Sequence, residues 1–356
     1  MPPAFGKCST RKLAALALLL AAMLLSGACT GHDPDARFDN YLSRLARTLG
    51  VEAQTPTPAH FPRPPRSGNV RLDVPPGSLN ALDFLSLRGC ELQLTVGKRN
   101  SSLGRMARAS QTLLLELEFL RLAPACIAYL EAENRDELAA TLARAREVKR
   151  AQLPARIFNA TLGSEEYRAF WQRARPAGTY PASGSAAAAA LTAINAYTVR
   201  WLNGDYRADG GEFELLLSEV AGGGGGALLA QLLRQQAWLD AASELLARRQ
   251  ARGPLCAPGI RHEAAQILPN VVRKYFIGEI QPHAAALGRS QYRLLPPVTA
   301  LESRLADTLP AVYRQWMTHR NTLLAEAIAA PQRHVAALQA IEAPCTGLER
   351  IAPREA

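Results

Sequence analysis

Apolar residues recur at helical spacing through most of the chain, and this pattern restricts the fold more than any other sequence feature. From Ser78 onward, leucines, isoleucines and aromatic residues repeat every three or four positions, as in residues 113–130 and 228–246. This period places apolar side chains on one helix face, which must pack against another helix. No Asn-Gly or Asp-Gly turn lies between alternating apolar segments. The sequence therefore predicts an all-α fold, a globular body of orthogonal or bundled helices.

Proline and glycine mark the expected ends of these helices. Because proline lacks an N–H group and its ring clashes with the preceding turn, we expect Pro154 to end one helical segment and Pro269 and Pro282 to bound another. Gly222–Gly226 is a run of five glycines, and each glycine costs roughly 1 kcal/mol inside a helix. This run predicts a loop, either a hinge or a surface insertion. The Pro/Gly/Ser/Ala-rich residues 176–186 are the best boundary within the body.

Two features precede this helical body, which we place at residues 78–356. Residues 34–49 are predicted to form a short amphipathic helix, with Asp35 positioned to cap it and Gly50 to stop it. Residues 51–68 contain five prolines, too many for a helix or a central strand. If extended, this linker would span roughly 55 Å. It is either a spacer from a membrane or an ordered loop on the body.

The N-terminus has the residue order of a bacterial export signal. Lys7, Arg11 and Lys12 precede an apolar run at residues 13–25, and Ser26-Gly27-Ala28-Cys29 follows. The run is short for a membrane span, which needs roughly 20 residues. This order predicts a lipoprotein signal peptide at residues 1–28, whose removal leaves an acylated Cys29. Two alternatives are a transmembrane segment and ordinary cleavage at the same bond, which would release a soluble periplasmic protein. Residues 29–77 then hold the anchor, the short helix and the linker.

Charge and localisation are consistent with this signal. The chain has 41 basic and 31 acidic residues, giving a formal net charge of +10, and only five of the basic residues are lysine. This arginine-rich charge either reflects codon bias in a GC-rich genome or provides a weak attraction to anionic lipid headgroups or cell-wall polymer. Nucleic acid is not an expected partner, because the basic residues do not alternate with stacking aromatic residues. Thr30 follows the cysteine, which favours sorting to the outer membrane of a Gram-negative envelope.

Apart from Cys8 and Cys29, the chain has four cysteines: Cys90, Cys126, Cys256 and Cys345. An even number in an oxidising compartment predicts two disulfides. Of the three connectivities, we choose the pairs that are nearer in sequence, Cys90–Cys126 and Cys256–Cys345. Free buried thiols are the alternative. No two of these cysteines have C-x-x-C spacing, so no metal site is predicted, and no cofactor is expected.

The most polar cluster of the body is Gly97–Gly104, which reads G-K-R-N-S-S-L-G. With an acidic residue of the following helix, it supplies the candidate site residues Arg99, Asn100, Ser101, Ser102 and Glu116. Their function would be to present Arg99 and the hydroxyls to a ligand. The alternative is a helix–helix turn in which Ser101 or Ser102 caps the next helix and Glu116 forms a buried ion pair with Arg99. We assign no catalytic residues.

The sequence resembles a family of proteobacterial lipoproteins, domain of unknown function 3080, over nearly the whole mature chain. The segments that carry this resemblance are Leu82-Asp83-Phe84-Leu85, Arg99–Gly104, Glu116, Cys126-Ile127, Lys149–Pro154 and Lys274-Tyr275-Phe276. The resemblance implies a lipoprotein of Gram-negative bacteria. It brings no known activity.

Together these features predict a lipid-anchored, disulfide-containing helical protein that faces the periplasm as a binding or scaffolding component of the envelope. Its expected partners are the membrane, through the anchor, and an envelope protein or the cell wall. One alternative is an enzyme acting on a cell-wall or lipid substrate through Arg99, Ser101 and Glu116. Another is a helical carrier of an apolar ligand.

Overall fold

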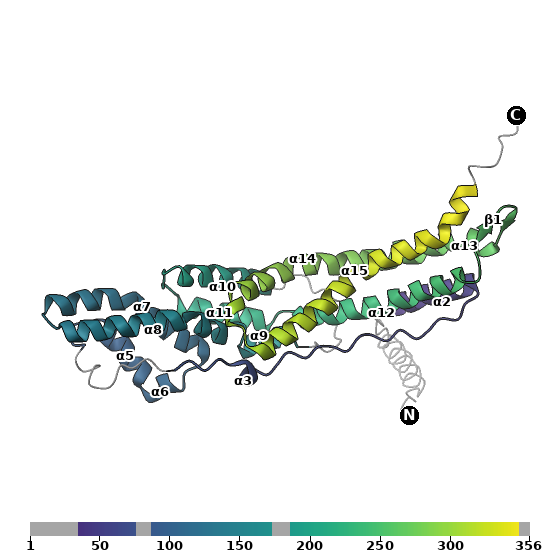
Figure 1. The fold of residues 1–356 in the computed structure, drawn as a ribbon. Coiled ribbons are helices and arrows are strands. Elements are labelled where there is room, and N and C mark those ends of the chain that lie inside the picture. The colour runs from purple at the N-terminus through teal and green to yellow at the C-terminus, as the bar shows by residue number, and fades with distance from the viewer. Residues whose placement is uncertain (1–34, 76–86, 173–185, 349–356) are drawn as a thin grey trace, which may run out of the picture.

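Long helices form the framework of the computed structural model, which describes residues 35–75, 87–172 and 186–348. The five longest are α7 (Ala109–Ala132), α8 (Asp136–Ala160), α12 (Gly225–Gln250), α14 (Gln281–Arg304) and α15 (Ala311–Leu348). They lie roughly along one axis and give an elongated bundle (Figure 1). The all-α prediction is confirmed.

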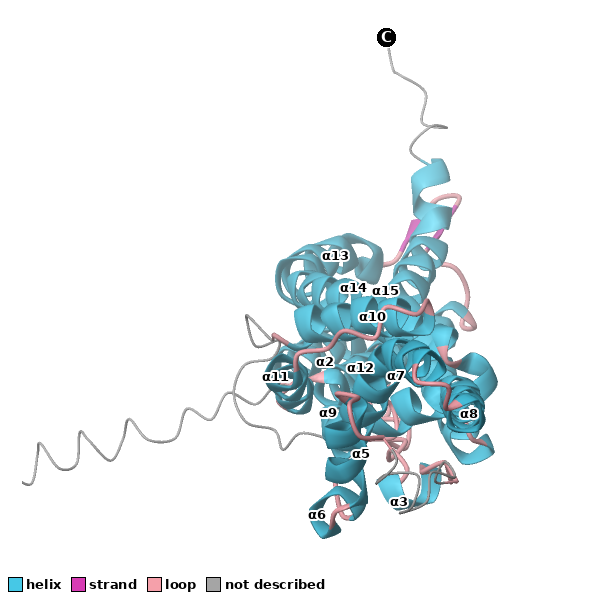
Figure 2. Ribbon diagram, turned by 90° about the vertical axis from the view of Figure 1, so that its left-hand side faces the viewer, coloured by secondary structure: helices cyan, strands magenta, loops and turns pink. Residues whose placement is uncertain are grey.

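Shorter elements complete the bundle. The other α-helices are α2 (Ala36–Leu49), α3 (Ser67–Val70), α5 (Leu92–Asn100), α6 (Ser102–Arg105), α9 (Glu165–Phe170), α10 (Ala187–Leu202), α11 (Gly210–Ala221) and α13 (Glu263–Val271). A π-helix η1 (Val272–Ile280), a 3-10 turn η2 (Ala306–Thr308) and a two-stranded antiparallel ribbon of β1 (Cys256–Ala257) and β2 (Ile260–Arg261) are also present. The view along the long axis shows α6 projecting from one side (Figure 2).

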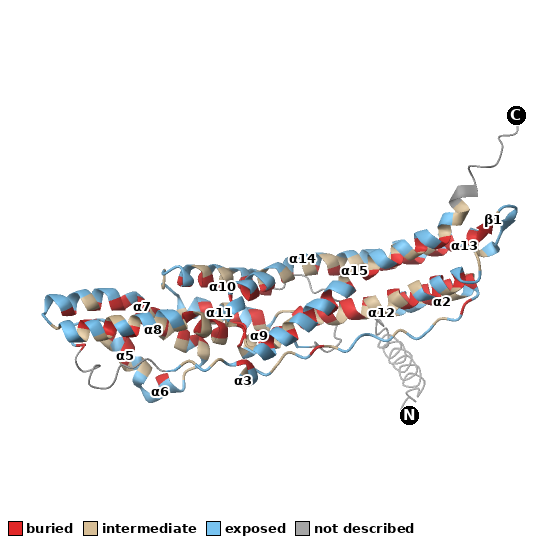
Figure 3. Cartoon of the chain, viewed as in Figure 1, coloured by how far each residue is buried: buried red, intermediate tan, exposed pale blue. Residues whose placement is uncertain are grey.

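The core consists of three clusters of buried side chains along the axis. One end holds a cluster between α5, α7 and α8, which includes Leu92, Leu122 and Leu142. The central cluster is the largest and contains Trp171 and Trp201. The opposite end packs α2 against α12, α13, η1 and α15. Buried residues accordingly line the inner faces of the helices, and exposed residues line the outer faces (Figure 3).

Two of the three prolines expected to bound helical segments lie inside helices. Pro154 lies inside α8 and Pro269 inside α13, while Pro282 lies in the first turn of α14. Helix α13, η1 and α14 follow one another without a loop. The π-helix ends just before Pro282, and such a widened turn accommodates a residue that cannot donate the usual backbone hydrogen bond. The predicted bounds at Pro154 and Pro269 are wrong, because packing keeps these segments helical, whereas the bound predicted at Pro282 falls at the junction of η1 and α14.

The glycine run is also packed more tightly than expected. Only Gly222–Gly224 lie between helices, and Gly225 and Gly226 belong to the first turn of α12. A Cβ on Gly225 would lie 2.3 Å from the Phe170 ring, and one on Gly226 would lie 2.0 Å from the Gln172 carbonyl oxygen. Both glycines are buried. The predicted loop is therefore confined to Gly222–Gly224, and the other two glycines form a close contact between α12 and the end of α9.

The proline-rich segment lies along the helices as an ordered chain (Figure 1). Trp316 Nε1 donates a hydrogen bond to the Pro62 carbonyl at 3.2 Å, and Phe61 packs on the central cluster. Farther along, the Asn159 side chain donates to and accepts from the Leu72 backbone, at 2.9 Å each. Of the two interpretations left open, these contacts match the ordered loop.

Two disulfides join the expected cysteines. The Sγ atoms are 2.05 Å apart in Cys90–Cys126 and 2.12 Å apart in Cys256–Cys345. The first links the start of α5 to α7, and the second links β1 to the end of α15. The predicted pairing is confirmed.

Several predictions fall outside the described residues. These are the signal peptide at 1–28, Cys29, the boundary at residues 77–78, and nearly all of the boundary at 176–186. Among the described residues, one helical stretch, Gly210–Gln250, has the length and hydropathy of a membrane span. It comprises α11 and α12, and α12 alone contributes Leu228, Leu232 and Leu245 to the core.

Candidate functional site

The polar segment predicted as a site forms the turn between α5 and α6. Ser101 is the N-cap of α6: its Oγ accepts a hydrogen bond from the Gly104 N–H at 3.0 Å and donates one to the Lys98 carbonyl at 2.7 Å. A Cβ on Gly104 would lie 2.0 Å from that same carbonyl oxygen, so only glycine fits here. Asn100 and Ser102 are exposed beside the cap. The predicted capping role is confirmed, with Ser101 as the capping residue.

Glu116 is buried on α7 and faces three cations. Its carboxylate lies 3.5 Å from Arg99 Nε, 2.5 Å from Lys149 Nζ and 3.8 Å from an Arg156 Nη atom. Burial lowers the pKa of Arg156, and the Glu116 charge opposes that shift. Lys149 Nζ also lies 4.8 Å from the centroid of the Phe119 ring. The ion pair with Arg99 is confirmed, and Glu116 joins α5, α7 and α8.

Lys149 and Arg156 were missed as partners of Glu116. They are seven residues apart on α8, which places both on one face of that helix. This spacing is visible in the sequence, but the orientation of that face toward α7 is not.

The site residues do not converge on one reacting point. The Ser101 hydroxyl is engaged by two backbone groups of its own turn, whereas Glu116 is engaged by Arg99, Lys149 and Arg156. A nucleophile needs a base within hydrogen-bond reach. In the described part of the chain, no side-chain base is hydrogen-bonded to Ser101.

A hollow of about 600 Å³ lies beside this turn. Three leucines of α7 form its apolar floor: Leu114, Leu115 and Leu117. Lys98, Ser101 and Arg121 supply polar groups to its lining. Glu118 is a carboxylate in the same lining. Neither Lys98 nor Arg121 forms an ion pair with a carboxylate of the described residues. The hollow is therefore lined by two cations that have no paired carboxylate among those residues.

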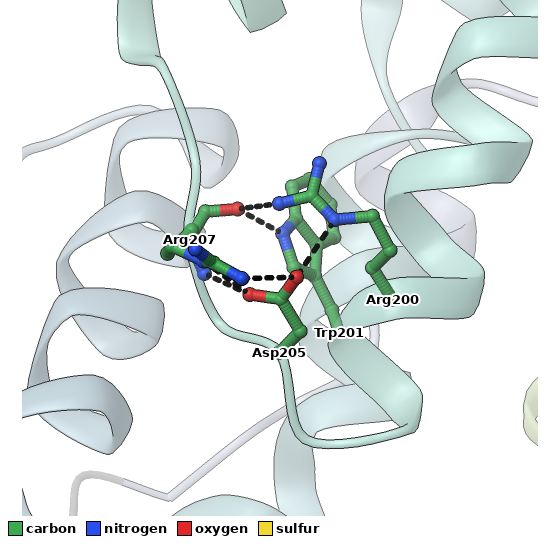
Figure 4. Close-up of polar contacts among 4 residues, drawn as sticks. All are labelled: Arg200, Trp201, Asp205 and Arg207. Carbon is green, nitrogen blue, oxygen red and sulfur yellow. Dashed lines mark hydrogen bonds and ion pairs between the residues drawn. The ribbon is translucent and has the colours of Figure 1, made fainter.

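The loop between α10 and α11 forms another wall through Tyr206 and Ala208. Asp205 fixes this loop, since its carboxylate lies 3.1 Å from Arg200 Nε and 3.0 Å from Arg207 Nε (Figure 4). The Arg207 carbonyl accepts hydrogen bonds from Arg200 and from Trp201 Nε1. Hydrogen bonds from Arg207 and Arg200 hold the pKa of the Asp205 carboxyl well below its usual range. The wall is thus shaped before any ligand binds.

A second buried charge pair lies in the central cluster. Arg320 on α15 binds Glu302 on α14 through two hydrogen bonds of 2.9 and 2.7 Å. The Tyr313 and Tyr167 hydroxyls also donate to this carboxylate, at 2.6 and 3.0 Å. The hydroxyls and the guanidinium are fully enclosed by protein, so this network binds helices together. This hydrogen-bond network was not predicted from the sequence, because Arg320 lies within an apolar helical pattern.

One buried histidine, His334, links α15 to α2 and α12. It is completely buried in the middle of α15, where Nε2 lies 2.7 Å from the Tyr41 hydroxyl and Nδ1 lies 2.9 Å from Ser243 Oγ. Burial lowers the pKa of His334 to about 4. Within the described residues, no cluster of three or more histidine, cysteine or acidic side chains could hold a metal ion.

One family model, described as "Protein of unknown function (DUF3080)", matches residues 38–347. This range includes every helix from α2 onward to α15 except for a few terminal residues. No curated protein and no solved structure matches the chain.

Proposed function

The chain belongs to the DUF3080 family, and from that premise we propose that it is a binding component of the bacterial cell envelope. In this proposal Cys29 is acylated, the protein faces the periplasm from the outer membrane, and the α5–α7 hollow is its binding site. The observation that carries the proposal is the lining of the hollow: an apolar floor next to Lys98 and Arg121, which have no carboxylate partner among the described residues.

The dimensions and lining of the hollow support one class of ligand. A volume of about 600 Å³ falls in the range of small-molecule pockets, which are mostly apolar with a few placed polar groups. Leu114 and Leu115 would contact an acyl chain, and the two cations exceed the single carboxylate Glu118. This combination favours an amphiphile with an anionic group.

The rigidity of the walls also supports binding. Ser101 caps α6, Glu116 anchors α5 through Arg99, and Asp205 holds the loop that carries Tyr206. A site that is already shaped loses little conformational entropy when a ligand binds. The two disulfides suit an oxidising compartment such as the periplasm.

The other two hypotheses have less support. An enzyme would need Arg99, Ser101 and Glu116 to converge, and the hydroxyl and the carboxylate each have other partners. A carrier of a purely apolar ligand would need a dry cavity, whereas this hollow is open and is lined by charged groups.

Binding is tested with a defined probe, a fluorescent lysophosphatidylglycerol, on the purified mature chain. Leu115→Trp should fill the hollow and raise the dissociation constant at least about tenfold, and Lys98→Glu/Arg121→Glu should weaken binding by electrostatic repulsion. Leu215→Trp is the matched control, because Leu215 is 60% exposed and does not line the hollow. Equal affinities of the wild type and both hollow variants for the lysolipid would overturn the proposal that the hollow is the binding site.

The anchor is tested separately by cell fractionation. Cys29→Ala removes the acylated thiol, so the protein should no longer be processed as a lipoprotein and its distribution between membranes should change. Unchanged outer-membrane partitioning would contradict acylation at Cys29, whatever the outcome at the hollow.

A further inference from the structure

A surface at the other end of the bundle carries positive charge on two adjacent elements. Helix α2 presents Arg37, Arg44 and Arg47, and η1 presents Arg273 and Lys274, all of which are exposed. We call these five residues the α2–η1 cationic face. Arg44 and Arg47 lie about two and three turns after Arg37, so the three arginines share one side of α2.

The charges of the two elements meet at one aromatic ring. The Arg44 guanidinium lies 5.3 Å from the centroid of the Tyr275 ring, and Lys274 Nζ lies 5.4 Å from the same centroid. Tyr275 itself is buried in the cluster that joins α2 to η1. Arg44 of α2 and Lys274 of η1 therefore both lie close to the same ring.

No carboxylate of the described residues forms an ion pair with any of these five cations. Arg44 and Arg273 instead have hydrogen bonds to the neutral amides of Asn40 and Asn270. The effect of this charge reaches a neighbouring group: burial first, and the Arg37 charge second, lower the pKa of His283. The surface therefore has a positive potential that a negative partner would neutralise.

The position of the anchor identifies that partner. Asp35 is fixed to the bundle by an ion pair with Arg234 at 3.3 Å, and Cys29 precedes Asp35 by six residues. Six residues span at most about 20 Å, so an acyl group on Cys29 would hold α2 close to a bilayer. Ile277, which is 49% exposed on η1, adds an apolar side chain next to the cations.

We propose that the α2–η1 cationic face lies against anionic lipid headgroups at the membrane surface. The nearness of the membrane rests on acylation of Cys29, as in the proposed function, whereas the affinity of the face for anionic lipid does not. The face and the hollow lie toward opposite ends of the bundle (Figure 1). Contact at α2 and η1 therefore leaves the hollow uncovered.

The test uses the mature chain, residues 29–356, with Cys29→Ser so that no acyl group contributes. It is sedimented with vesicles of phosphatidylethanolamine and phosphatidylglycerol, and with neutral phosphatidylcholine vesicles. We expect binding to the anionic vesicles alone. Because each basic residue near such a surface increases partitioning about fivefold, Arg44→Glu/Lys274→Glu should weaken it roughly 25-fold or more.

Arg304→Glu/Arg314→Glu is the matched control. It makes the same change in net charge at exposed residues of α14 and α15 that form no ion pair with a described carboxylate, and it should retain most of the binding. Arg44→Lys/Lys274→Arg keeps the charges and should bind like the wild type.

Equal losses of vesicle binding in the two glutamate double variants would show a general charge effect and overturn the proposal that the α2–η1 cationic face binds lipid. No loss of binding in either variant would overturn it as well. Far-UV circular dichroism of each variant establishes that it is folded. The Cys29→Ala fractionation tests acylation, and lysolipid binding tests the hollow as a binding site. A negative result in either experiment is therefore distinct from a negative result for the α2–η1 cationic face.

Discussion

At the scale of single residues, the buried Glu116 and Arg320 have charged partners from other helices. Arg320 lies between the Trp171 and Trp316 rings, 4.5 and 4.7 Å from their centroids, while it binds Glu302. A buried ion pair is only weakly stabilising overall, because desolvation offsets most of the attraction. Removing one partner is costly, since the remaining charge stays buried. These pairs therefore determine which helices can pack together.

The first prediction concerns Glu116. Glu116→Gln leaves Arg99, Lys149 and Arg156 without a counter-charge in a largely buried site. We expect the free energy of unfolding to fall by about 3 kcal/mol, as for other broken buried pairs. Urea unfolding of the oxidised protein measures this change.

Glu118→Gln is the control for this substitution. Glu118 lies on the same helix, is half-buried and forms no ion pair with the described cations. Its change should stay within about 0.5 kcal/mol. Equal effects of the two substitutions would mean that the three cations do not depend on Glu116.

The second prediction is a pH dependence that originates at His334. Its pKa is about 4 in the folded protein and about 6.5 in an unfolded chain, so between these values the unfolded state binds more protons. Its contribution to stability is therefore complete above pH 6.5 and declines as the pH falls through this window. The loss should reach about 3 kcal/mol near pH 4.

Urea unfolding across this pH range tests the prediction. His334→Gln, which can still hydrogen-bond to Tyr41 and Ser243, should remove this part of the slope. His319→Gln, at an exposed position of the same helix, should keep the wild-type slope. A wild-type slope in His334→Gln would exclude His334 as the source.

At the scale of elements, packing decides where a helix begins and ends. The sequence predicted loops or ends at Pro154, Pro269 and Gly225, and each of these residues lies inside a helix. Local propensity is worth at most a few kcal/mol per residue, and burial of the adjoining apolar faces outweighs it. Gly225 and Gly226 are required in α12 because Phe170 and Gln172 lie too close for a larger side chain, and not because the helix needs glycine there.

The third prediction compares two glycines of the same run. Gly226→Ala would place a Cβ 2.0 Å from the Gln172 carbonyl oxygen, a backbone atom that cannot turn aside. We expect a loss of about 3 kcal/mol in unfolding free energy. Gly222→Ala meets nothing closer than 3.7 Å and has a negative φ of −73°, so it should be neutral or slightly stabilising. Thermal unfolding measures both, and similar midpoints would refute the close contact.

At the scale of the whole molecule, the bundle has separate core clusters along its length and one disulfide at each end cluster. Cys90–Cys126 belongs to the α5–α7–α8 cluster and Cys256–Cys345 to the cluster that contains α2 and η1. The large central cluster lies between them. Each disulfide therefore restricts a different part of the chain.

The fourth prediction follows from this separation. The disulfides close sequence separations of 36 and 89 residues, for which the chain-entropy model gives about 4 and about 5 kcal/mol. Replacing each pair by alanine should lower stability by amounts of this order, and replacing both should give nearly the sum, because the two sites share no partners. Urea unfolding of the three variants measures this, and a combined loss far from the sum would indicate coupling through the central cluster.

Features that depend on neighbours in the chain were predictable from the sequence. Helical periodicity gave the all-α class, the Ser101 cap follows from a serine placed before a short helix, and the disulfide pairs join the nearer cysteines. The ion pair of Arg99 and Glu116 was predictable because Arg99 lies near the end of α5 and Glu116 in the first part of α7, the next long helix. The capping contact spans only three residues, so local spacing nearly fixes it. The disulfides close separations of 36 and 89 residues and were predictable only as the pairing of the cysteines nearer in sequence.

Tertiary structure alone decided which helix faces meet. His334 contacts Tyr41 from 293 positions away, Trp316 reaches Pro62 across 254, and the hollow needs Tyr206 beside α7. No local pattern encodes such a pairing, because each apolar face could bury the same area against several others. Close packing selects one arrangement, and that arrangement determines which prolines stay helical, which charges are buried and where a ligand can enter.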